Sequence, residues 1–336
     1  MRRLFVLLLL LAAPLPAGAN DGYAGLGAGG LEFGQSEHIR MLSEELHLSR
    51  SAVRVDYRFR NEGPADETVL VAFQLPPVAP ADLESGMALP EVLWQARTLD
   101  YLDFTATVDG RPVALRREAR YFLPNPEELY LWGLAALEAP GPDVTQRLLA
   151  LGVPETYDPA ILRDWFQALP AKERKALLAE GIFEMLEGGP TPRYFASLRF
   201  WWEQDFPAGR TLAIAHAYTP VLGASIYYVS EQMTEDFCID AGTRKAMDRV
   251  AASVEGKPDA YVLLTDLQYV LRTAGTWKGP IGHFRLTLDK EDPKAIVSLC
   301  ATGLTKTSPT TFVLERSDYV PAEDLRVLFT AAMGLE

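Results

Sequence analysis

Residues 52–60 read AVRVDYRFR, and apolar side chains alternate with charged ones along the stretch. Because successive side chains of a β-strand point to opposite faces, this period of two predicts a half-buried strand. Its apolar face carries Val53, Val55, Tyr57 and Phe59. This stretch therefore predicts that the protein contains a β-sheet with one solvated face.

A turn cluster, NEGP at 61–64, follows this strand, and the same alternation returns over 69–75 until Pro76 and Pro77 stop it. Two such strands around a polar turn predict a hairpin in an antiparallel sheet with one solvated face. The arginines on the polar face could bind an anionic ligand, but a solvated face with cross-strand ion pairs is favoured.

Strand-like alternation recurs over 102–118, 198–218 and 261–329, and the intervening residues 126–190 have helical periodicity. The sequence therefore predicts a mainly β protein built as one or two antiparallel β-sandwiches with a helical insertion. We expect an N-terminal β region at 20–125, the insertion at 126–190, and a C-terminal β region with one helix at 191–336. The two β regions are expected to pack together.

Three helices can be placed by their first residues. Asp158 and Pro159 are typical of a helix start, and the helix they open carries a Trp165/Phe166 stripe expected to dock on the sheet. A second helix is expected from Pro170, with one stripe consisting of Leu177, Leu178, Ile182 and Met185. Asp240 or Thr243 is expected to cap a third helix that runs through Val250.

The N-terminus has the order of a secretory leader. A basic start, MRR, precedes an uncharged apolar run over 4–13, and Ala17-Gly18-Ala19 supplies small residues for cleavage. The apolar run is too short to span a bilayer, which needs about 20 apolar residues. We therefore expect cleavage after Ala19 and a soluble periplasmic protein with no transmembrane anchor after signal cleavage.

Charge and composition exclude some partners. The formal net charge is −13, and a field of that sign repels nucleic acid. The glycines of 25–30 precede strand-like sequence instead of a helix, so an extended arm is favoured over a phosphate loop. No motif for a metal site or a cofactor is present, and we expect neither.

The two cysteines are Cys238 and Cys300. An even number of cysteines in an oxidising compartment favours a disulfide between them. The alternative is two buried free thiols.

Candidate ligand-binding residues are Trp201, Trp202 and His216. Adjacent residues on a strand face opposite sides, so one tryptophan is expected in the core and the other on the outer face or under the helical insertion. An exposed tryptophan can stack on a sugar ring, although coverage by the insertion is favoured. His216 shares a face with Leu212 and Ile214, which favours a core or interface histidine over a ligand-binding one. We expect no catalytic residues.

Several motifs together resemble one known family. They are GLGAGGLEF (25–33), VDYRFRN (55–61), VAFQLP (71–76), WEQDFPAG (202–209), HAYTP (216–220) with Gly223, WKGPIG (277–282) and SPTTF (308–312). The chain thereby resembles the exported bacterial family domain of unknown function 4424 over nearly the whole mature chain. The resemblance implies export and supplies no activity.

The leading hypothesis is a periplasmic, non-enzymatic binding or scaffolding protein of the cell envelope, with an envelope protein, glycan or lipid as partner. The alternative is a secreted hydrolase that uses carboxylates from distant strands, near His216 or near the Asp289–Asp292 cluster.

Overall fold

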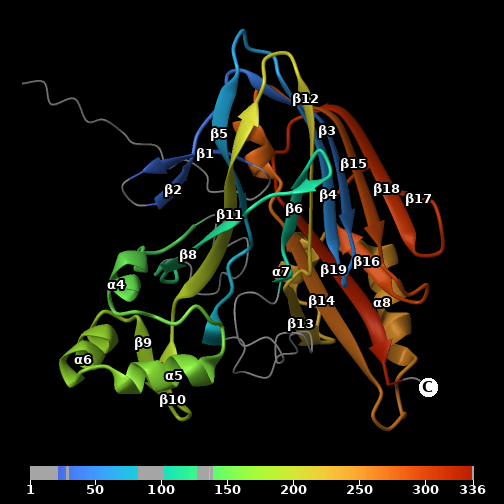
Figure 1. Cartoon of the computed structure of the whole chain (residues 1–336). Helices are drawn as coiled ribbons and strands as arrows, with labels where there is room; N and C mark the ends of the chain where they lie inside the picture. The colour runs from blue at the N-terminus through green and yellow to red at the C-terminus, as the bar shows by residue number, and fades with distance from the viewer. Residues whose placement is uncertain (1–21, 28–29, 82–101, 127–135, 137–138, 335–336) are drawn as a thin grey trace, which may run out of the picture.

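The computed structural model describes residues 22–27, 30–81, 102–126, 136 and 139–334. The expected leader at 1–19 and its cleavage site lie outside the described residues. Within the described residues, the chain forms three large sheets, a two-stranded hairpin and five α-helices (Figure 1). The predicted fold class, mainly β with antiparallel sheets arranged as a sandwich, is confirmed.

The largest sheet has eight strands, and the alternating sequence that begins at Val53 forms a strand in its middle. In spatial order the strands are β17 (Thr305–Lys306), β18 (Thr311–Tyr319), β15 (Ile281–Asp289), β3 (Ile39–Leu48), β4 (Val53–Asn61), β12 (Thr211–Tyr218), β6 (Thr105–Val108) and β7 (Arg111–Pro112). Burial along β4 alternates strictly, with the apolar residues inside. β3 and β15 run parallel, whereas the other strand pairs of this sheet are antiparallel.

Two further sheets complete the framework. The five-stranded sheet has the order β2 (Gly30–Phe33), β1 (Gly22–Gly27), β5 (Glu67–Gln74), β11 (Phe195–Phe206) and β8 (Arg116–Phe122). The four-stranded sheet has the order β13 (Leu222–Ile226), β14 (Tyr261–Tyr269), β19 (Leu325–Met333) and β16 (Ile296–Leu299).

The predicted hairpin over 53–75 is wrong, because its two strands lie in different sheets. β4 pairs with β3 and β12, whereas β5 pairs with β1 and β11. The chain therefore crosses between sheets after Asn61, and it crosses back between β11 and β12 at the same end of the molecule, the top of Figure 1. A short polar turn joins two packed sheets as readily as two paired strands, so the alternation alone did not distinguish them.

Aromatic side chains fill the core between the sheets. Trp277, which is 1% exposed, follows the 3₁₀ helix η2 (Arg272–Thr276). Its ring centre lies 4.7 Å from that of Phe59 and 6.1 Å from that of Phe206. The same segment holds the N-terminal arm, because the Thr276 hydroxyl accepts a hydrogen bond from the Tyr23 amide at 3.0 Å. Trp277 thus joins strands of the eight-stranded and the five-stranded sheets to one core.

The helical insertion contains α4 (Thr145–Ala150), α5 (Pro159–Ala168) and α6 (Ala171–Ala179). α5 starts as predicted, since the Asp158 carboxylate accepts a hydrogen bond from the Ala160 amide at 2.9 Å. Its aromatic stripe packs on a two-stranded hairpin of β9 (Phe183–Leu186) and β10 (Gly189–Pro192), where the Phe166 and Phe183 rings lie 4.6 Å apart. The insertion therefore contains β structure that was not predicted.

The helix predicted through Ile182 and Met185 ends earlier. α6 stops at Ala179, and Gly181 has a φ of 70°, the left-handed conformation that commonly ends helices. Ile182 is buried, while Met185 on β9 is 61% exposed. The apparent stripe therefore joined residues from a helix and a strand.

The C-terminal region contains a second helix besides the predicted one. α8 (Ala241–Ala252) is capped by Asp240, whose carboxylate accepts a hydrogen bond from the Thr243 amide at 2.6 Å. The additional helix, α7 (Glu231–Asp236), precedes it. Phe237, Ile239 and Met247 pack against Leu264 and Leu328 and cover one face of the four-stranded sheet.

Candidate functional site

His216 lies on β12 within the sandwich core and is 3% exposed. The rings of Phe73, Tyr57 and Phe104 surround it at centre distances of 4.6, 5.2 and 5.4 Å. Burial lowers the pKa of His216 to about 3, so the imidazole is neutral at physiological pH. This surrounding gives His216 a packing role, and ligand binding by it stays an untested prediction.

The two tryptophans face opposite sides of the five-stranded sheet, as predicted. Trp202 is 3% exposed and belongs to the main core. Trp201 is 9% exposed and packs beside Ala72 of β5 and Ala24 of β1. The N-terminal strand β1 therefore contributes to its surroundings, whereas the helical insertion was expected to do so.

Trp201 also has a cationic neighbour. The guanidinium carbon of Arg116 lies 4.9 Å from the ring centre, a geometry typical of a cation–π contact. This face of the Trp201 ring is therefore already in contact with protein.

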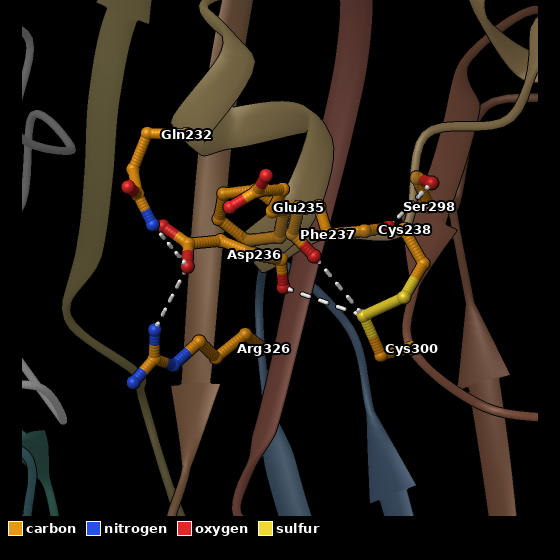
Figure 2. Close-up of a disulfide and its surroundings, with 8 residues drawn as sticks. All are labelled: Gln232, Glu235, Asp236, Phe237, Cys238, Ser298, Cys300 and Arg326. Atoms are coloured by element: carbon orange, nitrogen blue, oxygen red, sulfur yellow. Dashed lines mark hydrogen bonds and ion pairs between the residues drawn. A yellow bond between two sulfur atoms is a disulfide. The ribbon is translucent and has the colours of Figure 1, made fainter.

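The predicted disulfide between Cys238 and Cys300 is confirmed. It joins cysteines 62 residues apart whose Cα atoms lie 5.0 Å from each other. Cys238 lies between α7 and α8, and Cys300 follows β16, so the bond fastens the helical segment to the sheet (Figure 2). The Ser298 hydroxyl reinforces this junction by donating to the Phe237 carbonyl at 2.8 Å.

A polar network extends from α7 to the sheet. The Asp236 carboxylate accepts hydrogen bonds from the Gln232 amide at 3.0 Å and from the Arg326 guanidinium at 3.4 Å (Figure 2). Arg326 lies on β19, opposite Gln268 of β14. The network thus ties α7 to β19 of the sheet.

Asp266 lies on β14, and burial raises the pKa of its carboxyl group. Its carboxylate lies against Gly223 of β13, where an added Cβ would meet Oδ1 at 2.0 Å. The Gln268 amide donates to Oδ2 at 2.9 Å. Gly223 therefore provides the space that this carboxylate occupies, and the arrangement accounts for a glycine within the strand.

The carboxylates of the Asp289–Asp292 cluster, and the buried Glu44, are held by hydrogen bonds within the fold. Glu44 is buried and accepts a hydrogen bond from the Tyr269 hydroxyl at 3.4 Å. Asp289 and Asp292 accept hydrogen bonds from backbone amides of their own loop at 2.8 Å. Among the described residues, no group of three or more histidine, cysteine or acidic side chains is placed to hold a metal ion.

Two carboxylates do face each other on the outer surface of the eight-stranded sheet. Glu45 of β3 lies directly opposite Asp56 of β4. Burial, and then the charge of Glu45, raise the pKa of Asp56. Arg285 is the cross-strand neighbour of Glu45 on its other side and pairs with Glu315, so ion pairs border these two acids.

Two shallow grooves lie on the surface of the described residues. One of about 480 Å³ lies beside the β6–β7 turn and is bounded by Arg111, Gln204 and Asp205. Another of about 400 Å³ lies on β17 and β18 beside the Arg285–Glu315 pair. Neither contains a predicted site residue.

An apolar surface lies at one end of the four-stranded sheet. Ile226, Tyr228 and Tyr261 are 76%, 72% and 49% exposed. Ile226 is paired with Leu263, and Tyr261 lies two residues before Leu263 on the same strand, so Ile226 and Tyr261 face the same side. Tyr228 follows two residues after Ile226. We call Ile226, Tyr228 and Tyr261 the β13 patch.

Comparison with known proteins assigns the chain to a family. Residues 19–328 match the family described as Domain of unknown function (DUF4424). The chain belongs to this family. The resemblance inferred from the motifs is thereby confirmed for DUF4424, and no curated protein matches the sequence.

One solved structure is similar to this DUF4424 member. It is described as "a putative nutrient binding protein" from Legionella pneumophila subsp. pneumophila str. Philadelphia 1, with 16% sequence identity and a TM-score of 0.43. The match covers 88% of this chain and 68% of that one.

No helix among the described residues combines the length and the apolar character needed to cross a membrane. The sequence interpretation missed the β13 patch. Its signal was present in SIYYVS at 225–230, where Ile226 and Tyr228 share a face by period two. A five-residue strand that ends at Ile226 and is followed by two tyrosines has the same apolar composition as a buried strand.

A pH titration tests the environment of His216. Unfolded His216 binds a proton below pH 6.5, whereas the folded protein resists protonation of this ring down to about pH 3. Stability therefore falls as pH falls through this window, by at most about 1.4 kcal/mol per pH unit. We expect His216→Phe to have a shallower dependence of unfolding free energy on pH, measured by urea denaturation between pH 7 and 4. Equal slopes in the two proteins would contradict a buried neutral histidine.

Proposed function

We propose that this protein is an exported, periplasmic and non-enzymatic binding or scaffolding component of the cell envelope. Two kinds of observation support export. The sequence begins with a leader pattern, and the two cysteines form a disulfide, a bond that persists in oxidising compartments.

The β13 patch carries the binding part of this proposal. Contiguous exposed apolar surface commonly marks a site of interaction on a soluble protein. Ile226 and Tyr261 are exposed side chains at the end of one sheet, and the exposed Tyr228 follows two residues after the last residue of β13. The tyrosines suit a binding surface, since they combine apolar rings with polar hydroxyls. An envelope protein, a glycan or a lipid could supply the partner.

The compartment is tested by expressing the full chain with its own leader in a Gram-negative host. We expect to find the protein in the osmotic-shock fraction. Its intact mass should equal that of a chain that starts at Asn20. Cys238 and Cys300 should react with a thiol-alkylating reagent only after reduction. Protein recovered from cytosol with the leader intact and both thiols reactive would contradict export.

Binding is tested in the same cells with a photo-reactive benzoylphenylalanine at position 228. The matched control carries the same group at position 320, where Val320 is 66% exposed and lies after β18. We expect irradiation to give a defined adduct from position 228 and none from position 320, because the patch contacts a partner. Absence of an adduct from position 228, or equal adducts from both positions, counts against binding at this surface.

A further inference from the structure

We infer that β13 is an open edge strand that pairs with an extended, apolar and basic segment of another polypeptide. This inference rests on the proposed binding function and specifies its site and partner. β13 is the end strand of the four-stranded sheet, and within the described residues it pairs with β14 alone. An end strand has every second backbone amide and carbonyl directed away from its sheet, which defines an extended backbone as the complementary partner.

Three other end strands, β8, β7 and β16, are protected in ways that β13 is not. β8 carries Arg116, Arg117 and Arg120, and charged side chains discourage pairing with another chain. β7 has two residues, one of them Pro112, which lacks an amide hydrogen.

At the opposite end of the four-stranded sheet, β16 is tied to the α7–α8 segment by Ser298 and the disulfide at Cys300. β13 reads LGASI and contains no charge and no proline. An uncharged edge beside exposed apolar side chains is a template for pairing with another chain, which favours a partner at β13.

The β13 patch determines the character of the partner's side chains. A strand added beside β13 would place alternate residues on the same face as Ile226 and Tyr261. Burying these rings removes apolar surface from water, at about 25 cal/mol per Å². Apolar residues at every second position of the partner therefore fit this surface.

Charge determines the remaining positions. α7, which starts five residues after β13, contains three acidic residues and no basic one. Glu231 and Glu235 of this helix are exposed. The chain as a whole has a formal net charge of −13. Lysine or arginine between the apolar residues would therefore be attracted, whereas a second copy of this acidic chain would be repelled.

The test uses a fluorescent peptide that alternates lysine and valine, is blocked at both ends, and is titrated with the mature protein while anisotropy is measured. Two control peptides isolate the chemistry. One has N-methyl groups on alternate amides and cannot complete the hydrogen-bond ladder, and the other replaces lysine with glutamate. We expect the first peptide to bind with a Kd below about 1 mM and both controls to bind at least about tenfold more weakly.

Protein variants locate the site. Ile226→Ser and Tyr228→Ser should each weaken binding of the lysine–valine peptide by about tenfold, since each removes one side chain that the complex would bury. Val320→Ser makes a similar change at an exposed site elsewhere and should leave the affinity unchanged. Thermal unfolding of all three variants should match that of the parent protein.

Several outcomes would overturn the inference. They are no binding of the lysine–valine peptide, equal binding of the N-methylated or glutamate peptide, or equal effects of the Val320→Ser and Tyr228→Ser variants. A dimer seen by sedimentation that Ile226→Ser dissociates would identify a second copy as the occupant and also overturn it. An adduct from position 228 combined with any of these results would leave the proposed function standing and remove only the strand-pairing partner.

Discussion

Asn61 holds together the two places where the chain passes between the eight-stranded and the five-stranded sheets. Its side chain is fully buried, and its Nδ2 donates to the carbonyls of Phe206 at 2.7 Å and Ala65 at 2.9 Å. The backbone amide of Gly63 donates to Oδ1 of Asn61 at 2.8 Å. The backbone amide of Gly209 donates to the backbone carbonyl of Asn61 at 2.9 Å. Burying a polar amide is unfavourable unless its hydrogen bonds are made, so this position requires both crossings to lie together.

The rest of the framework follows from this junction. Once β4 and β5 are held in opposite sheets, their apolar faces point at each other and enclose Phe59, Phe73 and His216. The four-stranded sheet closes the same core, where the Tyr57 and Tyr269 hydroxyls lie 3.1 Å apart. The far end of that sheet extends beyond these contacts, which leaves the β13 patch outside the core. The β13 patch is thus exposed because the core contacts cover only part of the four-stranded sheet.

The sequence was sufficient for the elements whose pattern is local. The period of two identified β4 and β12, and the Asp158–Pro159 pair located the start of α5. The cysteine pairing was predicted from the expected oxidising compartment and an even number of cysteines. The partners of each strand could not be predicted. A polar turn such as residues 61–66 has the same kind of sequence whether it joins two paired strands or two packed sheets. The extension of α6 failed because Ile182 and Met185 continue a helical spacing by coincidence after Gly181 has ended the helix.

The candidate site was harder to predict, because what distinguishes it is exposure. Trp201, Trp202 and His216 have residue types that often bind ligands, yet all three are buried. Ile226 has the residue type of a core position and is 76% exposed. Whether an apolar residue lies under another element depends on contacts between distant segments, which alternation along one strand does not contain.

Residue-resolved hydrogen–deuterium exchange on the mature protein tests the central claim that a framework pinned at Asn61 leaves β13 open. The account predicts that the amides of Gly63 and Gly209 exchange as slowly as those in the centre of β4. It also predicts that every second amide of β13 exchanges as fast as those in exposed turns. Rapid exchange at Gly63 and Gly209, or slow exchange along all of β13, would contradict it.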